Sequence, residues 1–145
     1  MKPDTDAILP PVSTEDESIV DALLAKAREG TGKRPIGSRP DLDAIHFGHA
    51  GHFCGSDYCR FHLHTHVGPY CVSTVGDYWP RSASEQEPIG YQRAYETMVW
   101  RILPDGDTSA ESIDFAPYNT PEDADAGHAR LVRKWAHVAK RRAKR

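Results

Sequence analysis

The sequence predicts a small α+β domain, in which an antiparallel sheet of three or four strands packs against a C-terminal helix and follows an N-terminal one. Residues in the middle of the chain alternate as in half-buried strands, and an apolar stripe near the C-terminus recurs at helical spacing. A run of histidine and cysteine at residues 46–71 adds a loop rich in potential metal ligands. The 145 residues, 39% of them hydrophobic, suffice for one domain with a modest core.

A hairpin is the clearest strand signal. The segment 61–67 alternates strictly, with three histidines on one face and apolar or threonine side chains on the other. A Gly-Pro pair at 68–69 then indicates a turn into the β-rich segment 70–75. If Val67 pairs with Tyr70, the histidines share their face with a cysteine and a serine of the second strand. The pairs in this register are His66 with Cys71 and His64 with Ser73.

A helix is predicted near each end of the chain. Ser13 or Thr14 caps a first segment that carries apolar residues at helical spacing and ends at Gly30. We expect this helix to dock on the core, although a separate partner-binding arm fits the same pattern. Thr120 caps the last helix, and Pro121 occupies its first position. The apolar stripe of the last helix comprises Ala124, His128, Leu131, Trp135 and Val138.

Two more strands follow the hairpin, at residues 94–102 and, as a short element, around 113–115. Trp100 lies on the apolar face of the first of these, and Trp135 lies on the apolar stripe of the last helix. We therefore expect both tryptophans to be largely buried. His128, on the same stripe, is expected to be a hydrogen-bonded core histidine.

Charge is distributed unevenly along the chain. Residues 1–127 contain 10 basic and 21 acidic residues, whereas residues 128–145 contain eight basic residues and no acidic one. We place an N-terminal helix and Gly/Pro linker at 1–42, a His/Cys-rich α+β domain at 43–138 and a basic tail at 139–145. A basic helix end can lie on phosphates, or it can be a solvated end that aids solubility. The candidate nucleic-acid-binding residues are Arg133, Lys134, Lys140, Arg141, Arg142, Lys144 and Arg145.

Two cysteines and the histidines around them predict a metal site. Cys54 and Cys59 have a C-x4-C spacing, and thiolate and imidazole groups suit Zn²⁺ in a reducing compartment. A structural zinc site needs four such ligands, so neighbouring histidines would complete it. Buried free cysteines beside hydrogen-bonded histidines would give the same spacing. The candidate metal ligands are Cys54, Cys59, His49, His52 and His62.

The histidine face of the hairpin supports an alternative, catalytic site. Three imidazoles on one strand face, with Cys71 opposite, can hold a metal with an open position, although a solvated sheet face shows the same alternation. Ser73 lies beside these histidines. A carboxylate on or near the strands, such as Asp77, Glu96 or Asp114, can act as a base or orient a histidine. The candidate catalytic residues in this alternative are His62, His64 and His66.

Three segments of the sequence are distinctive together: HFGHAGHFCGSDYCRFHLHTHVGPYCVSTVGDYW, YETMVW and NTPEDADAGH. They resemble small proteins encoded by tailed bacteriophages and prophages, and the resemblance covers residues 44–136. No activity is assigned to that group. The resemblance therefore implies a phage or prophage origin and carries over no functional residue.

Compartment and function complete the prediction. Three cysteines are an odd number, which does not favour a disulfide framework, and the N-terminal residues show no apolar signal segment. No apolar run approaches the ~18 residues of a membrane span, so we expect a cytoplasmic protein, in the host cytoplasm if it is phage-encoded. The leading hypothesis is a small zinc-binding, phage-type accessory protein that binds nucleic acid or a host protein. The alternative is a small metal-dependent hydrolase that uses the histidine face.

Overall fold

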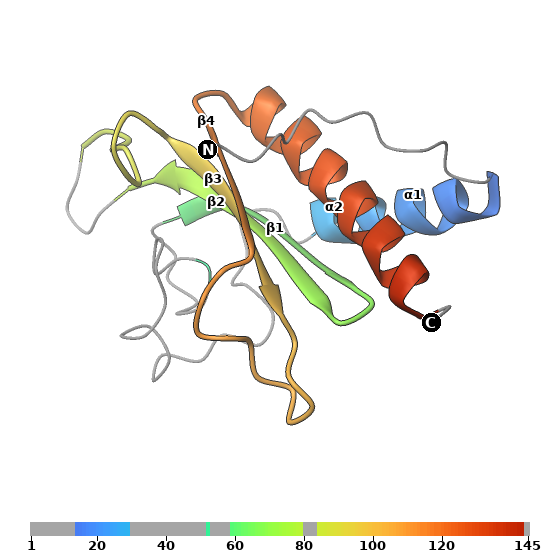
Figure 1. Cartoon of the computed structure of the whole chain (residues 1–145). Coiled ribbons are helices and arrows are strands. Elements are labelled where there is room, and N and C mark those ends of the chain that lie inside the picture. The colour runs from blue at the N-terminus through green and yellow to red at the C-terminus, as the bar shows by residue number, and fades with distance from the viewer. Residues whose placement is uncertain (1–13, 30–51, 53–58, 80–83, 144–145) are drawn as a thin grey trace.

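The strands form one four-stranded antiparallel sheet with both helices on the same side of it (Figure 1). The computed structural model describes residues 14–29, 52, 59–79 and 84–143. The elements in chain order are α1 (Thr14–Glu29), β1 (Cys59–Val67), β2 (Tyr70–Tyr78), β3 (Tyr95–Arg101), β4 (Asp114–Tyr118) and α2 (Pro121–Ala143). Neighbours in sequence are neighbours in the sheet, in the order β1-β2-β3-β4. This arrangement confirms the predicted α+β fold.

The hairpin of β1 and β2 has the register that the alternation predicts. Val67 pairs with Tyr70 across the turn. Gly68 in the turn has a φ of +54°, and a methyl group on it would meet Ala139 Cβ at 2.7 Å, so only glycine fits there. The pairs that follow are His66 with Cys71 and His64 with Ser73.

The register gives the sheet two faces of different chemistry, because successive strand residues point to opposite sides. The helix face, which α1 and α2 cover, carries Leu63, Thr65, Val67, Tyr70, Val72, Thr74, Thr97, Val99 and Ala116. The opposite histidine face carries His62, His64, His66, Cys71, Ser73, Val75, Glu96, Met98 and Trp100.

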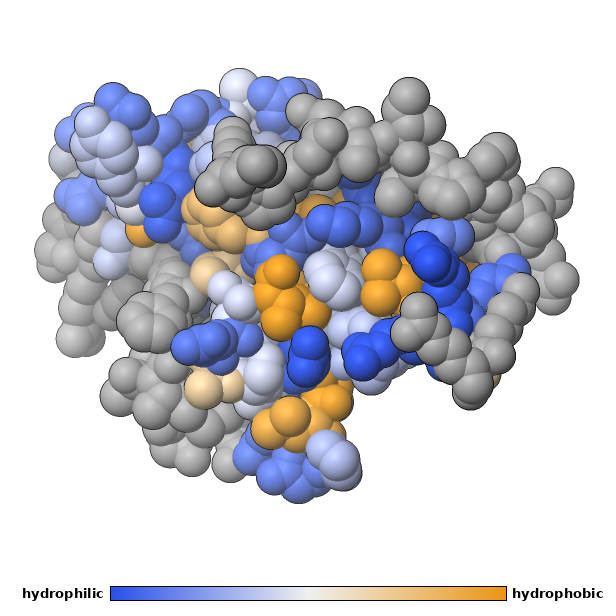
Figure 2. Space-filling model, in the orientation of Figure 1, coloured by the Kyte–Doolittle hydropathy of each residue, from blue (hydrophilic) through white to orange (hydrophobic). Residues whose placement is uncertain are grey.

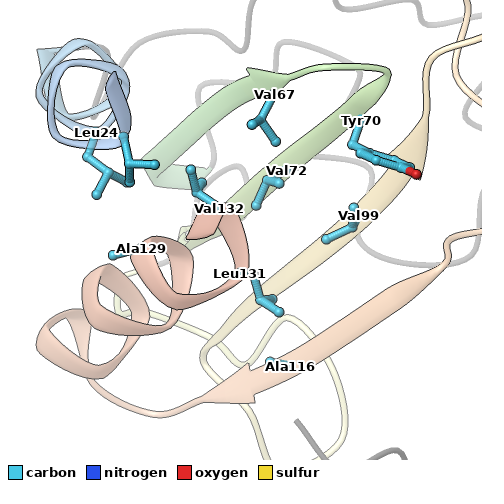
Figure 3. Packing of buried hydrophobic residues seen from close by; sticks show 10 residues of the cluster. Leu24, Val67, Tyr70, Val72, Val99, Ala116, Ala129, Leu131 and Val132 are labelled. Atoms are coloured by element: carbon cyan, nitrogen blue, oxygen red, sulfur yellow. The ribbon is translucent and has the colours of Figure 1, made fainter. Parts of the chain in front are cut away.

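The hydrophobic core lies between the helix face and the two helices. Leu131 and Val132 of α2 are fully buried and belong to one cluster with Val72 and Val99 of the sheet (Figure 3). Leu24 of α1 joins the same cluster and is only 4% exposed. Burying an aliphatic side chain of this size stabilises the fold by roughly 1.5–3 kcal/mol. The docking of the first helix on the core, as predicted, is confirmed.

Ion pairs between the two helices show in which direction α1 runs along α2. The Arg28 guanidinium donates two hydrogen bonds to the Asp125 carboxylate, at 2.8 and 2.6 Å. Nearer the start of α1, Glu17 and Asp21 approach Arg133 of α2. The Arg133 Nη2 atom lies 3.4 Å from a Glu17 oxygen and 3.8 Å from an Asp21 oxygen. The start of α1 therefore lies beside the middle of α2, and its end lies beside the start of α2. The two helices are antiparallel where they meet.

The start of α2 forms as its cap predicts. Thr120 Oγ1 accepts a hydrogen bond from the Asp123 backbone N–H at 3.1 Å, which satisfies one of the open N–H groups of the first turn. The stripe members Ala124, His128 and Leu131 are at most 1% exposed.

The two tryptophans differ in burial. Trp100 is fully buried, as predicted. Trp135 is half-buried rather than largely buried. Its ring packs against Tyr70, with 4.8 Å between ring centroids, while its indole N–H donates to Asp114 Oδ2 at 2.9 Å. An indole placed so that its N–H reaches a carboxylate at the rim of the core keeps one edge outside it.

Few large apolar side chains remain on the surface of the described residues. The exposed ones are Ile19, Tyr91, Leu103 and Phe115. The surface in view is mostly hydrophilic, and its hydrophobic residues form small separate groups (Figure 2). Within the described ranges, neither helix has the length and apolar character needed to cross a membrane.

Candidate metal centre

Three potential metal ligands meet on the histidine face of the hairpin. His64 and His66 are two residues apart on β1, so both point to this face, and Cys71 of β2 pairs with His66. The ligand atoms of the three residues all lie within 4.8 Å of one another. Cys71 Sγ lies 3.3 Å from His64 Nε2, and the centroids of the two imidazole rings are 5.3 Å apart. This metal cluster, His64, His66 and Cys71, can hold a metal ion.

Burial controls the protonation of the ligands. Burial, followed by repulsion from three neighbouring histidines, lowers the pKa of His64 from 6.5 to about 3. Its imidazole is therefore neutral at physiological pH, which is the form that binds metals. Burial raises the pKa of the Cys71 thiol from 9.0 to about 12, so this thiol keeps its proton until a metal displaces it. His66 is exposed, and partial burial of its ring lowers its pKa below 6.5.

The cluster offers two imidazole nitrogens and one sulfur. Such donors suit soft or borderline metal ions in tetrahedral geometry. Three protein ligands leave one tetrahedral position for a fourth group. Because His66 is exposed, the cluster reaches the surface of the described residues.

A chain of buried polar side chains lies beside the metal cluster. His52 bonds through Nδ1 to Ser73 Oγ at 2.7 Å, and through Nε2 to Glu96 Oε2 at 3.0 Å. Arg93 Nε donates to the other Glu96 oxygen at 3.1 Å. The His52 ring also meets Trp100 edge to face, with 5.2 Å between centroids. Glu96 is thus a carboxylate that orients a histidine, which is one of the two roles expected for it from the sequence.

The structure describes three of the five ligands predicted around the C-x4-C motif, and each has other contacts. Cys59 is buried in a small apolar cluster. The His62 Nε2–H donates to the backbone carbonyl of Cys59. His52 belongs to the polar chain described above. Cys54 and His49 lie outside the described residues, so their part in a metal site stays a prediction.

The predicted catalytic set, His62, His64 and His66, overlaps with the metal cluster. His64 and His66 belong to both, whereas His62 is not part of the metal cluster. The sequence predicts that Cys71 lies opposite the histidines, but the predicted site residues do not include it. The signal that makes it a potential ligand is the hairpin register, which brings it opposite His66.

Several basic residues predicted to bind nucleic acid have partners within the protein. Arg133 pairs with acidic residues of α1, and Lys134 Nζ lies 2.8 Å from Asp114 Oδ2. Arg142 Nη1 donates to the Tyr70 hydroxyl at 2.9 Å. The exposed basic residues in the last turn of α2 are Lys140, Arg141 and Arg142. The remaining candidates, Lys144 and Arg145, lie outside the described residues.

A groove of about 1000 Å³ lies between β4 and α2, away from the metal cluster. It is lined by cations of α2, Arg130 and Lys134, and by the carboxylates of Asp114 and Asp123. β4 and β1 are the opposite edges of the sheet, so the groove and the metal cluster do not adjoin. The mixed charges of the groove favour no particular ligand.

Known proteins offer no direct guide to this site. Comparison of the chain with protein-family models, with curated proteins and with solved structures finds no match. The features of the structure that bear on function are the metal cluster, its exposure and the polar chain beside it.

Proposed function

We propose that this protein binds one zinc ion through His64, His66 and Cys71 and acts as a small metal-dependent hydrolase. The observation that carries the proposal is the approach of three ligand atoms to within 4.8 Å of one another. Two paired strands supply them, so backbone pairing sets their spacing. A site built on strands is held more tightly than one built on a loop.

The donor atoms favour zinc. Zn²⁺ binds cysteine sulfur and histidine nitrogen, whereas Mg²⁺ and Ca²⁺ prefer oxygen ligands. Cys71 is a free thiol, and a thiol ligand persists in a reducing compartment such as the cytoplasm. His64 is neutral at physiological pH because burial lowers its pKa to about 3. His64 is thus ready to bind, and Cys71 has only to lose its proton.

The position of the metal cluster favours catalysis over a purely structural role. A structural zinc ion is enclosed by four ligands and supplies the folding energy of its domain. Here ten buried hydrophobic residues form a core on the opposite face of the sheet, and His66 is exposed. Zinc with three protein ligands keeps a position for water and lowers the pKa of that water to about 7. An ion held by His64, His66 and Cys71 would supply an activated water for the hydrolysis of a carbonyl or phosphoryl compound.

Metal analysis and cobalt substitution test the zinc site. We expect purified protein to carry one zinc ion per chain. Co²⁺ in its place should give a thiolate-to-cobalt charge-transfer band that Cys71→Ser abolishes and His66→Ala weakens. Cys59→Ser is the matched control, because it alters the other described cysteine. A band that is lost in Cys59→Ser and kept in Cys71→Ser would move the ion to the C-x4-C motif and overturn this assignment.

An activated ester tests the hydrolase. Zinc-loaded protein should hydrolyse 4-nitrophenyl acetate, a chelator should abolish the activity, and added zinc should restore it. The chelated protein should stay folded, as judged by circular dichroism, because the core does not include the metal cluster. Hydrolysis that persists in the chelated protein, or none from the zinc-loaded protein, would remove the hydrolase and leave a zinc-binding protein.

The end of α2 supports a second candidate function, the binding of nucleic acid. The observation that favours it is the run of three exposed cations at a helix C-terminus, Lys140, Arg141 and Arg142. Truncation after Ala139 should weaken DNA or RNA binding at low salt and make the salt dependence shallower, since each lost phosphate contact lowers the slope by about one unit. A gel-shift series over salt concentration measures both effects. Full-length protein that shifts no nucleic acid at low salt contradicts this function.

A further inference from the structure

The buried polar chain beside the metal cluster ends opposite a metal ligand. Ser73 pairs directly with His64 in the hairpin, so both side chains lie on the histidine face. Directly opposite residues of antiparallel strands have Cβ atoms about 4.5–5.5 Å apart. The chain that runs from Arg93 through Glu96 and His52 therefore reaches the neighbourhood of His64 at its Ser73 end.

With His52 neutral and Glu96 ionised, each hydrogen bond of this chain has one direction. Arg93 Nε can only donate, so the Glu96 carboxylate accepts its hydrogen bond at 3.1 Å. The other Glu96 oxygen then accepts the Nε2–H of His52 at 3.0 Å. A neutral imidazole with its proton on Nε2 has a lone pair on Nδ1, which accepts the Ser73 O–H at 2.7 Å. Ser73 Oγ can therefore accept a further hydrogen bond through a lone pair, but it has no other proton to donate.

His64 has the complementary requirement. Its Nε2 lies 3.3 Å from Cys71 Sγ and is the nitrogen that faces the metal cluster. Its Nδ1 is buried and, among the described residues, has no hydrogen-bond partner. Once Nε2 binds a metal, the single proton of the neutral ring has to be on Nδ1. Metal-binding histidines almost always donate that proton to an acceptor, which fixes the orientation of the ring.

We propose that Ser73 accepts the Nδ1–H of His64 in the metal-bound protein, which makes Ser73, His52 and Glu96 positioning residues for this ligand. The inference rests on the zinc site proposed above. Glu96 holds His52 in one tautomer, His52 holds Ser73 as an acceptor, and Ser73 holds the ring of His64.

Zinc affinity tests the positioning role. Ser73→Ala removes the acceptor and should weaken zinc binding by about 10- to 100-fold, the usual effect of losing such a partner. Glu96→Gln keeps the shape of the side chain but no longer fixes the His52 tautomer, so it should weaken binding in the same direction. Thr74→Val is the matched control. It removes the hydroxyl of the next residue on β2, which contacts His128 on the helix face at 2.7 Å, so it should lower stability and leave zinc affinity unchanged.

A spectroscopic readout separates positioning from a merely structural contribution. In ¹⁵N NMR spectra of the zinc-saturated protein, His64 should carry a slowly exchanging proton on Nδ1. Ser73→Ala, saturated with zinc at higher concentration, should lose this protected resonance because its acceptor is gone. Thr74→Val should keep it.

The outcomes are distinguishable. Wild-type protein that binds no zinc refutes the zinc site itself. Wild-type protein that binds zinc, with a folded Ser73→Ala variant of equal affinity and an unchanged His64 resonance, refutes the positioning role alone. If Ser73→Ala does not fold, Glu96→Gln and the hydroxyl-retaining Ser73→Thr decide. Wild-type affinity in Ser73→Thr with weakened binding in Glu96→Gln supports the role, and wild-type affinity in Glu96→Gln overturns it.

Discussion

The two faces of the sheet share the same strands but bury different kinds of side chains. On the helix face, ten buried hydrophobic residues from the sheet and both helices form one core. On the histidine face, the described apolar clusters are small, and buried polar groups such as His52, Ser73 and Glu96 lie between them. Burial of apolar surface on the helix face stabilises the fold. The histidine face can therefore hold buried polar groups, because the main apolar core lies on the other face.

Two histidines, one on each side of the sheet, make the comparison sharp. Burial lowers the pKa of both His128 and His64 to about 3. Both ring nitrogens of His128 are occupied, by Thr65 Oγ1 at 2.8 Å and Thr74 Oγ1 at 2.7 Å. His64 instead has one nitrogen beside the Cys71 thiol and the other without a partner in the described residues. The depressed pKa therefore does not distinguish the two histidines, whereas the contacts of their ring nitrogens do.

Acid should produce the largest effect, and His128 on the helix face should contribute to it together with His64, because both have a pKa of about 3. The pKa of His128 is about 3 in the folded protein and 6.5 in the unfolded chain, so the unfolded chain binds more protons between these values. The stability that depends on neutral His128 is present above pH 6.5 and is lost as pH falls toward 3. At 1.36 kcal/mol per pKa unit, the loss is on the order of 5 kcal/mol. Urea unfolding at several pH values measures it, and His128→Gln should reduce the dependence and leave the part that comes from His64. An equal dependence in both proteins would contradict this assignment.

A core substitution should separate stability from metal binding. Leu131 is fully buried between α2 and the sheet, so Leu131→Ala should lower the free energy of unfolding by about 2–5 kcal/mol. Zinc affinity of the folded variant should stay at the wild-type value, because the metal cluster lies on the other face. Urea unfolding and zinc titration at low temperature measure the two quantities. A fall in zinc affinity of the folded variant would show that the two faces are coupled.

Zinc affinity should depend on pH through a single protein ligand. The Cys71 thiol, with a pKa of about 12, must lose a proton on binding, whereas His64 is neutral already. Between pH 7 and 8, loss of the Cys71 proton should raise affinity at least tenfold, or about 1.4 kcal/mol, and a zinc-bound water with a pKa of about 7 adds part of a second proton to the one that Cys71 releases. Calorimetry in buffers of different ionisation enthalpy counts the protons. Release of more than two would indicate a second thiol ligand, and release of none would exclude Cys71.

The charged contacts between the helices should have the smallest effect. Arg28 and Asp125 are 48% and 36% exposed in their side chains, and exposed ion pairs contribute about 0.2–1 kcal/mol. Arg28→Ala should therefore lower stability by no more than this, and less at high salt. Leu24→Ala, on the buried side of the same helix, should lower it several times more. Equal losses would mean that charge, and not burial, holds α1 on the helix face.

The local patterns of the sequence determined the elements and the register of the hairpin. Alternation from residue 61 to 67 and the Gly-Pro turn predict that His66 lies opposite Cys71, and the structure has this pairing. The reason is that a slip of one residue would turn the histidines into the core and the apolar residues out of it. The sequence also predicts the cap of α2 at Thr120, because capping depends on neighbours within one turn.

Only the tertiary structure decided which groups meet. Spacing along the chain, as in the C-x4-C motif, does not set a distance between side chains. The hairpin register predicts which residues are neighbours, but it does not predict that the ligand atoms of His64, His66 and Cys71 converge to within 4.8 Å. His52 reaches Glu96, which is 44 residues away, and Arg133 and Lys134 find acidic partners on α1 and β4. Periodicity reports which face a side chain points to. Which partner it meets there depends on how the strands and helices pack, and that is settled by contacts between residues far apart in the sequence.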